Sequence, residues 1–168
     1  MNALLIIADK DFRDEELFVT KSELENYKIK TIVASSKMAE CTGMLKKTIM
    51  PDMLVSDAVA KNYDSIIFVG GTGMSKYFND PIMLSLAKQF YAQGKVVAAI
   101  CIAPVILANS GILKGKKATV SESMANNLTI QGAEYISQSC VVDGKVITAN
   151  GPAASKEFAK EIIKLLIK

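Results

Sequence analysis

The chain has 168 residues, of which 50% are hydrophobic and 22% are charged, and its formal net charge is +3. This length and composition suit one globular domain over residues 1–168, not a disordered or fibrous chain. The sequence contains no histidine. That absence excludes Ser-His-Asp and Cys-His activation of a nucleophile within the chain, and also metal sites that need imidazole. Acid–base chemistry near neutral pH therefore falls to a carboxyl, thiol, amine or phenol with a displaced pKa.

The charge pattern and the cysteines indicate the cellular setting. Lysines alternate with acidic residues instead of forming a basic block, so we expect no nucleic-acid partner. No apolar run approaches the ~20 residues of a membrane span, and the first residues lack the basic segment of a signal peptide. Cys41, Cys101 and Cys140 are too few and too widely spaced for a disulfide framework. We therefore expect a cytoplasmic protein with no membrane partner.

Short apolar runs alternate with helical segments over the first two-thirds of the chain. The runs are continuous, as in strands buried on both faces, and they cover residues 3–8, 29–35, 64–69 and 95–100. Helices are expected at 14–26, from Asp80–Pro81 to about Gln93, and from Cys101 to about Ser110. This alternation predicts an α/β sandwich with a mainly parallel sheet.

The remaining segments are less regular. Gly43 and Pro51 interrupt residues 41–54, in which residues 46–50 are compatible with pairing at a sheet edge. One or two helical turns are expected at 56–61. Asp143–Gly144 separates two apolar runs, 140–142 and 146–148, which predicts a hairpin that adds an antiparallel edge to the sheet. Pro152 opens a last helix with an apolar face.

Cys101 is the first candidate for a functional side chain. It lies between the run 95–100 and Pro104, where a strand ends and a helix begins. Free backbone N–H groups and the helix dipole at such a place are expected to stabilise the thiolate and lower the pKa of the thiol. This is the arrangement of a nucleophile elbow. A buried, inert core cysteine is the alternative, and position alone does not separate the two interpretations.

Gly70 and Gly71, which follow the run 64–69, are the second candidate. Glycines at the carboxyl end of a strand allow close backbone approach, and their N–H groups can stabilise an oxyanion or an oxidised cysteine. A simple tight turn is the commoner reason for such a pair. The segment is not a phosphate-binding P-loop, because the Gly-Lys-Ser/Thr ending is absent.

The acidic residues Asp14, Glu15 and Glu16 are the third candidate, at the start of the expected helix 14–26. Acids are favoured in a first helical turn, and this accounts for Glu15. Glu16 adjoins Leu17 and can turn inward. A buried Glu16 beside a thiolate would keep its proton, because like charge and desolvation both raise its pKa, and it could then donate a hydrogen bond to sulfur.

Four motifs occur in an order that is fairly specific in combination. They are DEEL near the start, IIFVGG, VVAAICIAPVILANSGILKGKKAT around Cys101, and TANGPAASKEFA near the end. Together they resemble the ThiJ/PfpI family of the class I glutamine-amidotransferase-like superfamily over nearly the whole chain. Residues 49–52 and 151–159 are most similar to the branch of the Parkinson-disease-linked protein and its ThiJ deglycase relatives. The resemblance implies a flavodoxin-like three-layer sandwich and a homodimer.

The resemblance also implies roles for individual residues. Cys101 corresponds to the elbow cysteine, Glu16 to the glutamate that hydrogen-bonds the thiol, and Gly70, Gly71 and Ile102 to the backbone amides beside it. The sequence departs from the family at three other features. Ile102 and Ser121 stand where hydrolytic branches carry histidine, and Ser75 stands where protease-like members carry a glutamate.

These features lead to one main functional hypothesis and two alternatives. The main hypothesis is handling of small reactive carbonyls such as glyoxals, by a glyoxalase- or deglycase-like reaction of Cys101 with Glu16. The first alternative is a non-enzymatic oxidant sensor or chaperone that uses an oxidisable Cys101. An intracellular cysteine peptidase is the least favoured, because the histidines are missing. No metal or other cofactor is expected.

Overall fold

The protein is described by a computed structural model of residues 1–168, which is built on a seven-stranded sheet. The strand order is β11-β12-β8-β7-β1-β3-β6, and only the β11–β12 pair is antiparallel. The strands are β1 (Asn2–Ile6), β3 (Lys30–Ser35), β6 (Met53–Leu54), β7 (Ser65–Phe68), β8 (Val96–Ile100), β11 (Cys140–Asp143) and β12 (Val146–Ala149). The predicted mainly parallel sheet with an antiparallel edge hairpin is confirmed.

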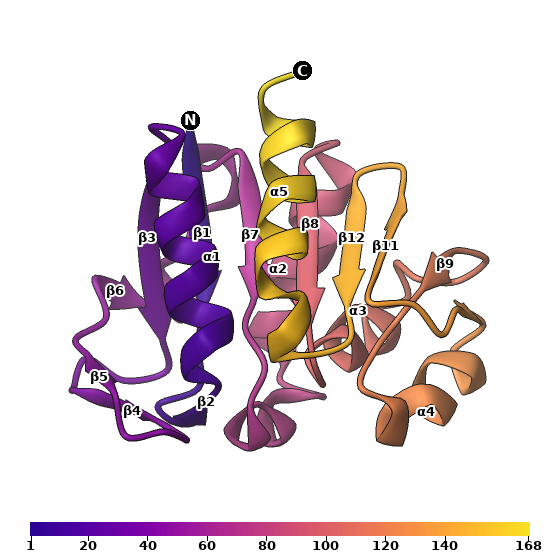
Figure 1. The fold of residues 1–168 in the computed structure, drawn as a ribbon, viewed down its shortest axis with the longest axis horizontal. Coiled ribbons are helices and arrows are strands. Elements are labelled where there is room, and N and C mark those ends of the chain that lie inside the picture. The colour runs from indigo at the N-terminus through magenta and orange to yellow at the C-terminus, as the bar shows by residue number, and fades with distance from the viewer.

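Helices cover both faces of this sheet (Figure 1). The helices α1 (Asp14–Asn26) and α5 (Ser155–Leu166) lie side by side on one face, and α2 (Pro81–Ala92) and α3 (Pro104–Asn109) lie on the other. Side chains of β1 alternate between the two layers: Leu4 packs in the same cluster as Phe90 of α2, and Leu5 in the same cluster as Phe158 of α5. Because both faces are buried, the strands appear in the sequence as continuous apolar runs.

Two small sheets and short helical segments complete the fold. β2 (Lys10–Phe12), β4 (Cys41–Gly43) and β5 (Thr48–Ile49) form one sheet, and β9 (Lys117–Ala118) pairs with β10 (Glu134–Tyr135). The α-helix α4 (Ala125–Ile130) follows β9. The 3₁₀ segments are Val55–Asp57, Ala60–Asn62, Thr72–Tyr77, Glu122–Met124 and Pro152–Ala154. The expectation that residues 46–50 pair at a sheet edge is confirmed for Thr48 and Ile49, which pair antiparallel with β4 at the edge of the small three-stranded sheet.

Several helix boundaries follow from local signals. The predicted helix 14–26 coincides with α1. Asp80 caps α2 by accepting hydrogen bonds from the amides of Ile82 and Met83 at 2.9 and 3.1 Å, and Pro81 occupies the first turn. The helix expected from Cys101 begins instead at Pro104, because Cys101 has a φ of 64° and belongs to a turn. No helix is long and apolar enough to span a membrane.

The direction in which the chain adds strands to the sheet reverses between β1 and β7. The chain passes from β1 to β3 on one side and later returns to β7 on the other, so connections diverge from the carboxyl ends of β1 and β7. Ligands of open α/β sheets bind at such a point. The small β2–β4–β5 sheet and α4 lie at this same end of the molecule (Figure 1).

Candidate active site

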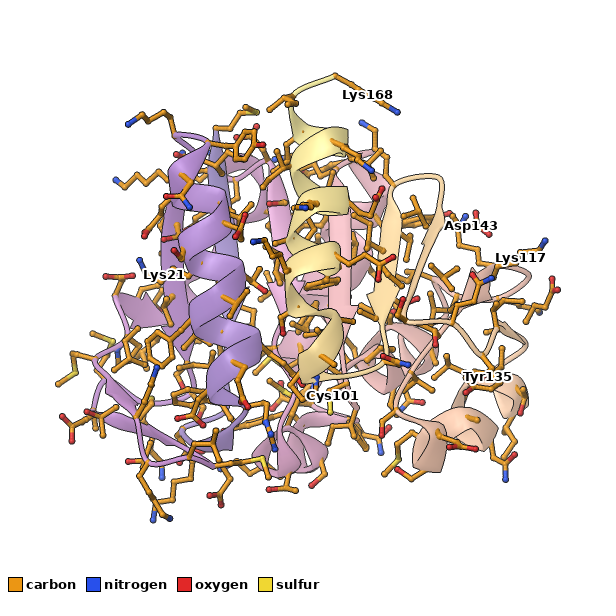
Figure 2. The ribbon with its side chains drawn as sticks, in the orientation of Figure 1. Lys21, Cys101, Lys117, Tyr135, Asp143 and Lys168 are labelled. Carbon is orange, nitrogen blue, oxygen red and sulfur yellow. The ribbon has the colours of Figure 1, made fainter.

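Cys101 occupies a strained turn at the carboxyl end of β8. Its φ of 64° lies in the left-handed region that side chains rarely adopt. Two hydrogen bonds hold this turn: the Cys101 amide donates to the carbonyl of Ala149 at 2.9 Å, and its carbonyl accepts from the amide of Ser121 at 2.8 Å. Figure 2 shows Cys101 at the carboxyl end of the sheet, close to the start of α5. The elbow expected from the sequence is therefore formed.

Because Gly70 has no side chain, the backbone that follows β7 can lie directly against the turn at Cys101. A Cβ atom at this position would lie 2.5 Å from the Cβ of Cys101 and 2.6 Å from Oε2 of Glu16. No side chain fits there. The adjacent Gly71 has a φ of 104°, so it too adopts a conformation that favours glycine.

Glu16 lies on the first turn of α1, fully buried behind the elbow. Its Oε2 accepts a hydrogen bond from the amide of Gly70 at 2.8 Å, whereas Oε1 has no hydrogen-bond partner of regular geometry. Burial raises the pKa of Glu16 to about 7, although the Gly70 amide and the nearby Cys101 thiol lower it in part. The expected retention of a proton by Glu16 is thus supported by its surroundings.

The Gly70 amide does not have the role expected of it. Because it donates to Glu16, it is not free to stabilise an oxyanion on a substrate. The amides of Gly71 and Ile102 are the two that interact with the sulfur of Cys101, and both favour its thiolate form. Gly70 therefore positions Glu16, and the other two amides remain available for negative charge at the reacting atoms.

The Cys101 thiol is less acidic than the elbow position alone predicts. Burial, followed by the negative charge of Glu16, raises the pKa of Cys101 to about 11, and the Gly71 and Ile102 amides offset only part of this. The expected lowering of this pKa is wrong, because desolvation and the adjacent carboxylate outweigh the effect of the backbone amides. The two groups form a coupled pair in which ionisation of one opposes ionisation of the other.

A cavity of about 400 Å³ lies over the elbow. Its wall is formed by Arg13, Met44, Gly71, Thr72, Ser75, Cys101, Ile102, Ser121, Ser123, Met124 and Pro152. The predicted residues Gly71, Cys101 and Ile102 thus meet at one surface, and Glu16 and Gly70 lie behind it. Ser75 and Ser121, at the positions where the resemblance implies a glutamate and a histidine, also line the cavity.

Arg13 and Met44 are among the wall residues that were not identified from the sequence. Arg13 immediately precedes α1, and its side chain forms an ion pair with Glu15. In the sequence, the one feature that points to Arg13 is its position next to the acidic residues that open α1. Met44 comes from the β4–β5 hairpin, which is distant from Cys101 in sequence. Only the folded arrangement brings this segment to the site.

The other cysteines do not line the cavity. Cys41 is fully buried, and burial raises its pKa. Cys140 is partly buried, and burial together with Glu157 raises its pKa to about 12. No group of three carboxylates or thiols is placed to hold a metal ion. Cys101 is therefore the only cysteine with access to a ligand-sized space.

The chain is similar to known proteins over nearly its whole length. An uncharacterized protein of Methanocaldococcus jannaschii is 43% identical over 98% of this chain and 82% of its own length. Glutathione-independent glyoxalase DJR-1.2 of Caenorhabditis elegans is 29% identical over 98% of this chain and 88% of its own. Deglycase PfpI of Pyrococcus furiosus is 26% identical over 97% of this chain and 98% of its own length.

Solved structures show the same fold. The crystal structure of a ThiJ/PfpI domain protein from Brachyspira murdochii has a TM-score of 0.97, 34% identity, and coverage of 99% of this chain and 96% of its own. The crystal structure of Drosophila melanogaster DJ-1beta has a TM-score of 0.89 and 29% identity, and the match covers 98% of this chain and 89% of its own. Residues 1–165 match the DJ-1/PfpI family. The chain therefore belongs to the DJ-1/PfpI family and has its flavodoxin-like α/β fold.

Proposed function

We propose that this protein converts small 2-oxoaldehydes to 2-hydroxy acids with Cys101 as the nucleophile. The observation that carries the proposal is the pairing of Cys101 with a buried Glu16 beside a cavity of about 400 Å³. The names of relatives, a glyoxalase and several deglycases, support the same chemistry. Since the chain has no histidine, Glu16 is the group beside the sulfur that can carry a proton.

The first step is addition of the thiol to the aldehyde. As sulfur bonds to the carbonyl carbon, the π-electron pair moves to oxygen, and ionised Glu16 takes the thiol proton. The amides of Gly71 and Ile102 stabilise the negative charge on oxygen until it receives a proton, which gives a hemithioacetal. The pKa of Glu16, about 7, suits a group that accepts and returns protons near neutral pH.

The second step is a proton transfer within the adduct. Glu16 removes the proton from the carbon bonded to sulfur and returns it to the adjacent ketone carbon. The proton of the hemithioacetal hydroxyl moves to the ketone oxygen, so the first oxygen becomes the carbonyl of a thioester and the second becomes a hydroxyl. The product is a thioester of a 2-hydroxy acid. Water then cleaves the carbon–sulfur bond, which releases the acid and restores the thiol. One water molecule is consumed, and no external oxidant or reductant is required.

The test is a steady-state assay of lactate formation from methylglyoxal. We expect Cys101→Ser to reduce the rate to background, because a serine hydroxyl lacks a workable anionic fraction without a strong base. We expect Glu16→Ala to reduce it by about a hundredfold or more, the effect typical of losing a general acid–base group. Cys140→Ser, outside the cavity, serves as the matched control. Equal rates for wild type and Cys101→Ser would refute the proposal.

An oxidant sensor is the second candidate, and one observation favours it. The amides of Gly71 and Ile102 beside the sulfur can also hold the oxygens of a sulfinate, with protonated Glu16 as a further donor. Intact-mass and peptide analysis after mild peroxide separates this function from the first. A sensor predicts oxidation concentrated at Cys101, and oxidation spread evenly over the three cysteines would argue against it.

A further inference from the structure

Arg13 is the only residue with a charged side chain on the cavity wall. Its backbone is fixed where α1 begins: its amide donates to the carbonyl of Gly70 at 2.9 Å, and its carbonyl accepts from the amide of Leu17 at 3.2 Å. Its side chain is 28% exposed. A cation is thus built into the wall that also contains Cys101.

Glu15 orients one edge of the Arg13 guanidinium. Nε donates to one oxygen of Glu15 at 2.8 Å, and Nη2 donates to the other at 3.1 Å. A guanidinium has five N–H donors, so this bidentate pair uses two of them. The N–H groups on Nη1 have no partner in the structure. The remaining donors are therefore available to a ligand, on a group that is already oriented.

The rest of the wall also favours a ligand that accepts hydrogen bonds. Hydroxyl groups line the cavity at Thr72, Ser75, Ser121 and Ser123, and no carboxylate lies on the wall. Glu16 is fully buried behind it. An anionic ligand would consequently meet a cation and several hydroxyl donors without meeting an acidic wall residue.

The ion pair with Glu15 restricts the charge of the ligand. Because Glu15 offsets much of the Arg13 charge, the field at the wall is that of a weak cation. A phosphate dianion would be repelled by Glu15, whereas a carboxylate carries one charge and matches the planar guanidinium donors. Carboxylate is therefore the anion that this arrangement suits best.

We propose that Arg13 binds a carboxylate of the substrate, so that the site prefers aldehydes bearing a carboxylate, such as glyoxylate, to neutral ones such as methylglyoxal. The inference rests on the proposed function in that Cys101 is the group that adds to the aldehyde. With glyoxylate the step ends at a reversible hemithioacetal: a sulfur–carbon bond forms, the carbonyl π pair moves to oxygen, and the thiol proton moves through Glu16 to that oxygen.

The experiment measures protection of Cys101 from iodoacetamide by each aldehyde, with the alkylated peptide quantified by mass spectrometry. In wild type we expect glyoxylate to protect at lower concentration than methylglyoxal. In Arg13→Met we expect the ratio of the two half-protecting concentrations to shift against glyoxylate by about ten- to a hundredfold, as for loss of a hydrogen bond to a charged group. Arg13→Lys should recover part of this preference.

Two further variants test whether loss of the Arg13 guanidinium itself causes the shift in the ratio. In Arg13→Met, Glu15 loses its partner and its free negative charge could repel glyoxylate. The double variant Arg13→Met with Glu15→Gln removes both charges, so a shift of the same size there shows that the unpaired Glu15 is not the cause. Lys21→Met is the matched control, since Lys21 pairs with Glu25 further along α1 and lies apart from Cys101 (Figure 2). It should retain the wild-type ratio.

The outcomes separate this inference from the proposed function. An unchanged ratio in Arg13→Met, or a wild type that is protected better by methylglyoxal, would overturn the inference while leaving methylglyoxal turnover intact. Conversely, Arg13-dependent protection by glyoxylate in an enzyme that makes no lactate would overturn the proposed function and leave the carboxylate site standing. If neither aldehyde protects Cys101 in wild type, both are wrong.

Discussion

Ionised Glu16 opposes the ionisation of Cys101, whereas the Cys101 thiol favours the ionised form of Glu16 by hydrogen bonding. Glu16 is fully buried and Cys101 is partly buried, and the carboxylate raises the pKa of the thiol in addition to the effect of burial. The resting thiol therefore keeps its proton near neutral pH. In the proposed reaction the sulfur becomes nucleophilic as Glu16 takes that proton, so the carboxyl contributes to the reaction and does more than position the thiol.

Replacement of Glu16 by glutamine tests this coupling. Glu16→Gln removes the negative charge and keeps an amide that can donate to sulfur, so we expect the pKa of Cys101 to fall. The pH profile of Cys101 alkylation by iodoacetamide should move to lower pH than in wild type. Glu15→Gln is the control, because Glu15 pairs with Arg13 instead of the thiol. A profile that is unchanged, or that moves to higher pH, would show that Glu16 does not suppress the thiolate.

The sequence indicated some candidate residues of the site, but not the partner of the Gly70 amide. Cys101, Glu16 and the two glycines follow strand ends or open a helix, and the sequence shows such positions. The amide of Gly70, however, donates to a carboxylate 54 residues away in sequence. That partner depends on how α1 packs against β7. Local sequence signals cannot show this, and the same is true of the raised pKa of Cys101.

At the level of elements, the β4–β5 hairpin is attached to α1 by one buried carboxylate. Asp14 accepts hydrogen bonds from the amides of Leu45 and Lys47 at 2.7 and 2.9 Å. The amide of Met44 donates to the carbonyl of Phe12 at 2.8 Å. These bonds place Met44 on the cavity wall. Asp14 therefore links the start of α1 to the segment that closes one side of the site.

Loss of the Asp14 carboxylate should release this hairpin. We expect Asp14→Asn to lower the free energy of unfolding by about 2 kcal/mol, because charge-assisted bonds are lost and an amide group opposes a backbone N–H. Tryptic cleavage after the exposed Lys46 and Lys47 should become faster under native conditions. Limited proteolysis with mass spectrometry measures this. Glu15→Gln is again the neighbouring control. Unchanged cleavage in Asp14→Asn would show that the hairpin is held by other contacts.

The elements that the sequence predicted are those with a long, uniform pattern. The buried strands and helices α1 and α2 have continuous apolar runs or clear end signals such as Asp80–Pro81. The strands β5, β9 and β10 have only two residues each, which is too short for any periodicity to appear. The start of α3 was misplaced because the elbow at Cys101 uses a backbone conformation that composition does not reveal.

For the whole molecule, two buried carboxylates respond to pH in opposite directions. Asp9, after β1, forms ion pairs with Lys37 and Lys76 and accepts from the Tyr77 hydroxyl at 3.1 Å. Burial opposes its ionisation, but these partners prevail and lower the pKa of Asp9 below its ordinary value. Its contribution to stability is thus present above pH 3.8 and is lost as the pH falls. Glu16 has a raised pKa, so its contribution to stability is present at low pH and is lost as the pH rises.

The pH dependence of unfolding should reveal Glu16 in the intact fold. Its pKa rises from 4.5 to about 7 on folding. The folded state therefore binds the proton more tightly, and the resulting stabilisation is complete below pH 4.5 and lost as the pH rises through about 7. Glu16→Gln does not titrate. Its free energy of unfolding, relative to wild type, should increase by about 2 to 3 kcal/mol between pH 5 and pH 8.

Urea denaturation of both proteins at a series of pH values measures this difference, and any constant offset from packing cancels in the comparison. Glu15→Gln should show no comparable rise over the same range, because the ion pair with Arg13 lowers the pKa of Glu15 and moves its titration below pH 4.5. If the free energy of unfolding of Glu16→Gln differs from that of wild type by a constant amount from pH 5 to pH 8, Glu16 titrates near its ordinary pKa. In that case Glu16 would be ionised throughout this range, and its proposed part in proton transfer near neutral pH would lose its basis.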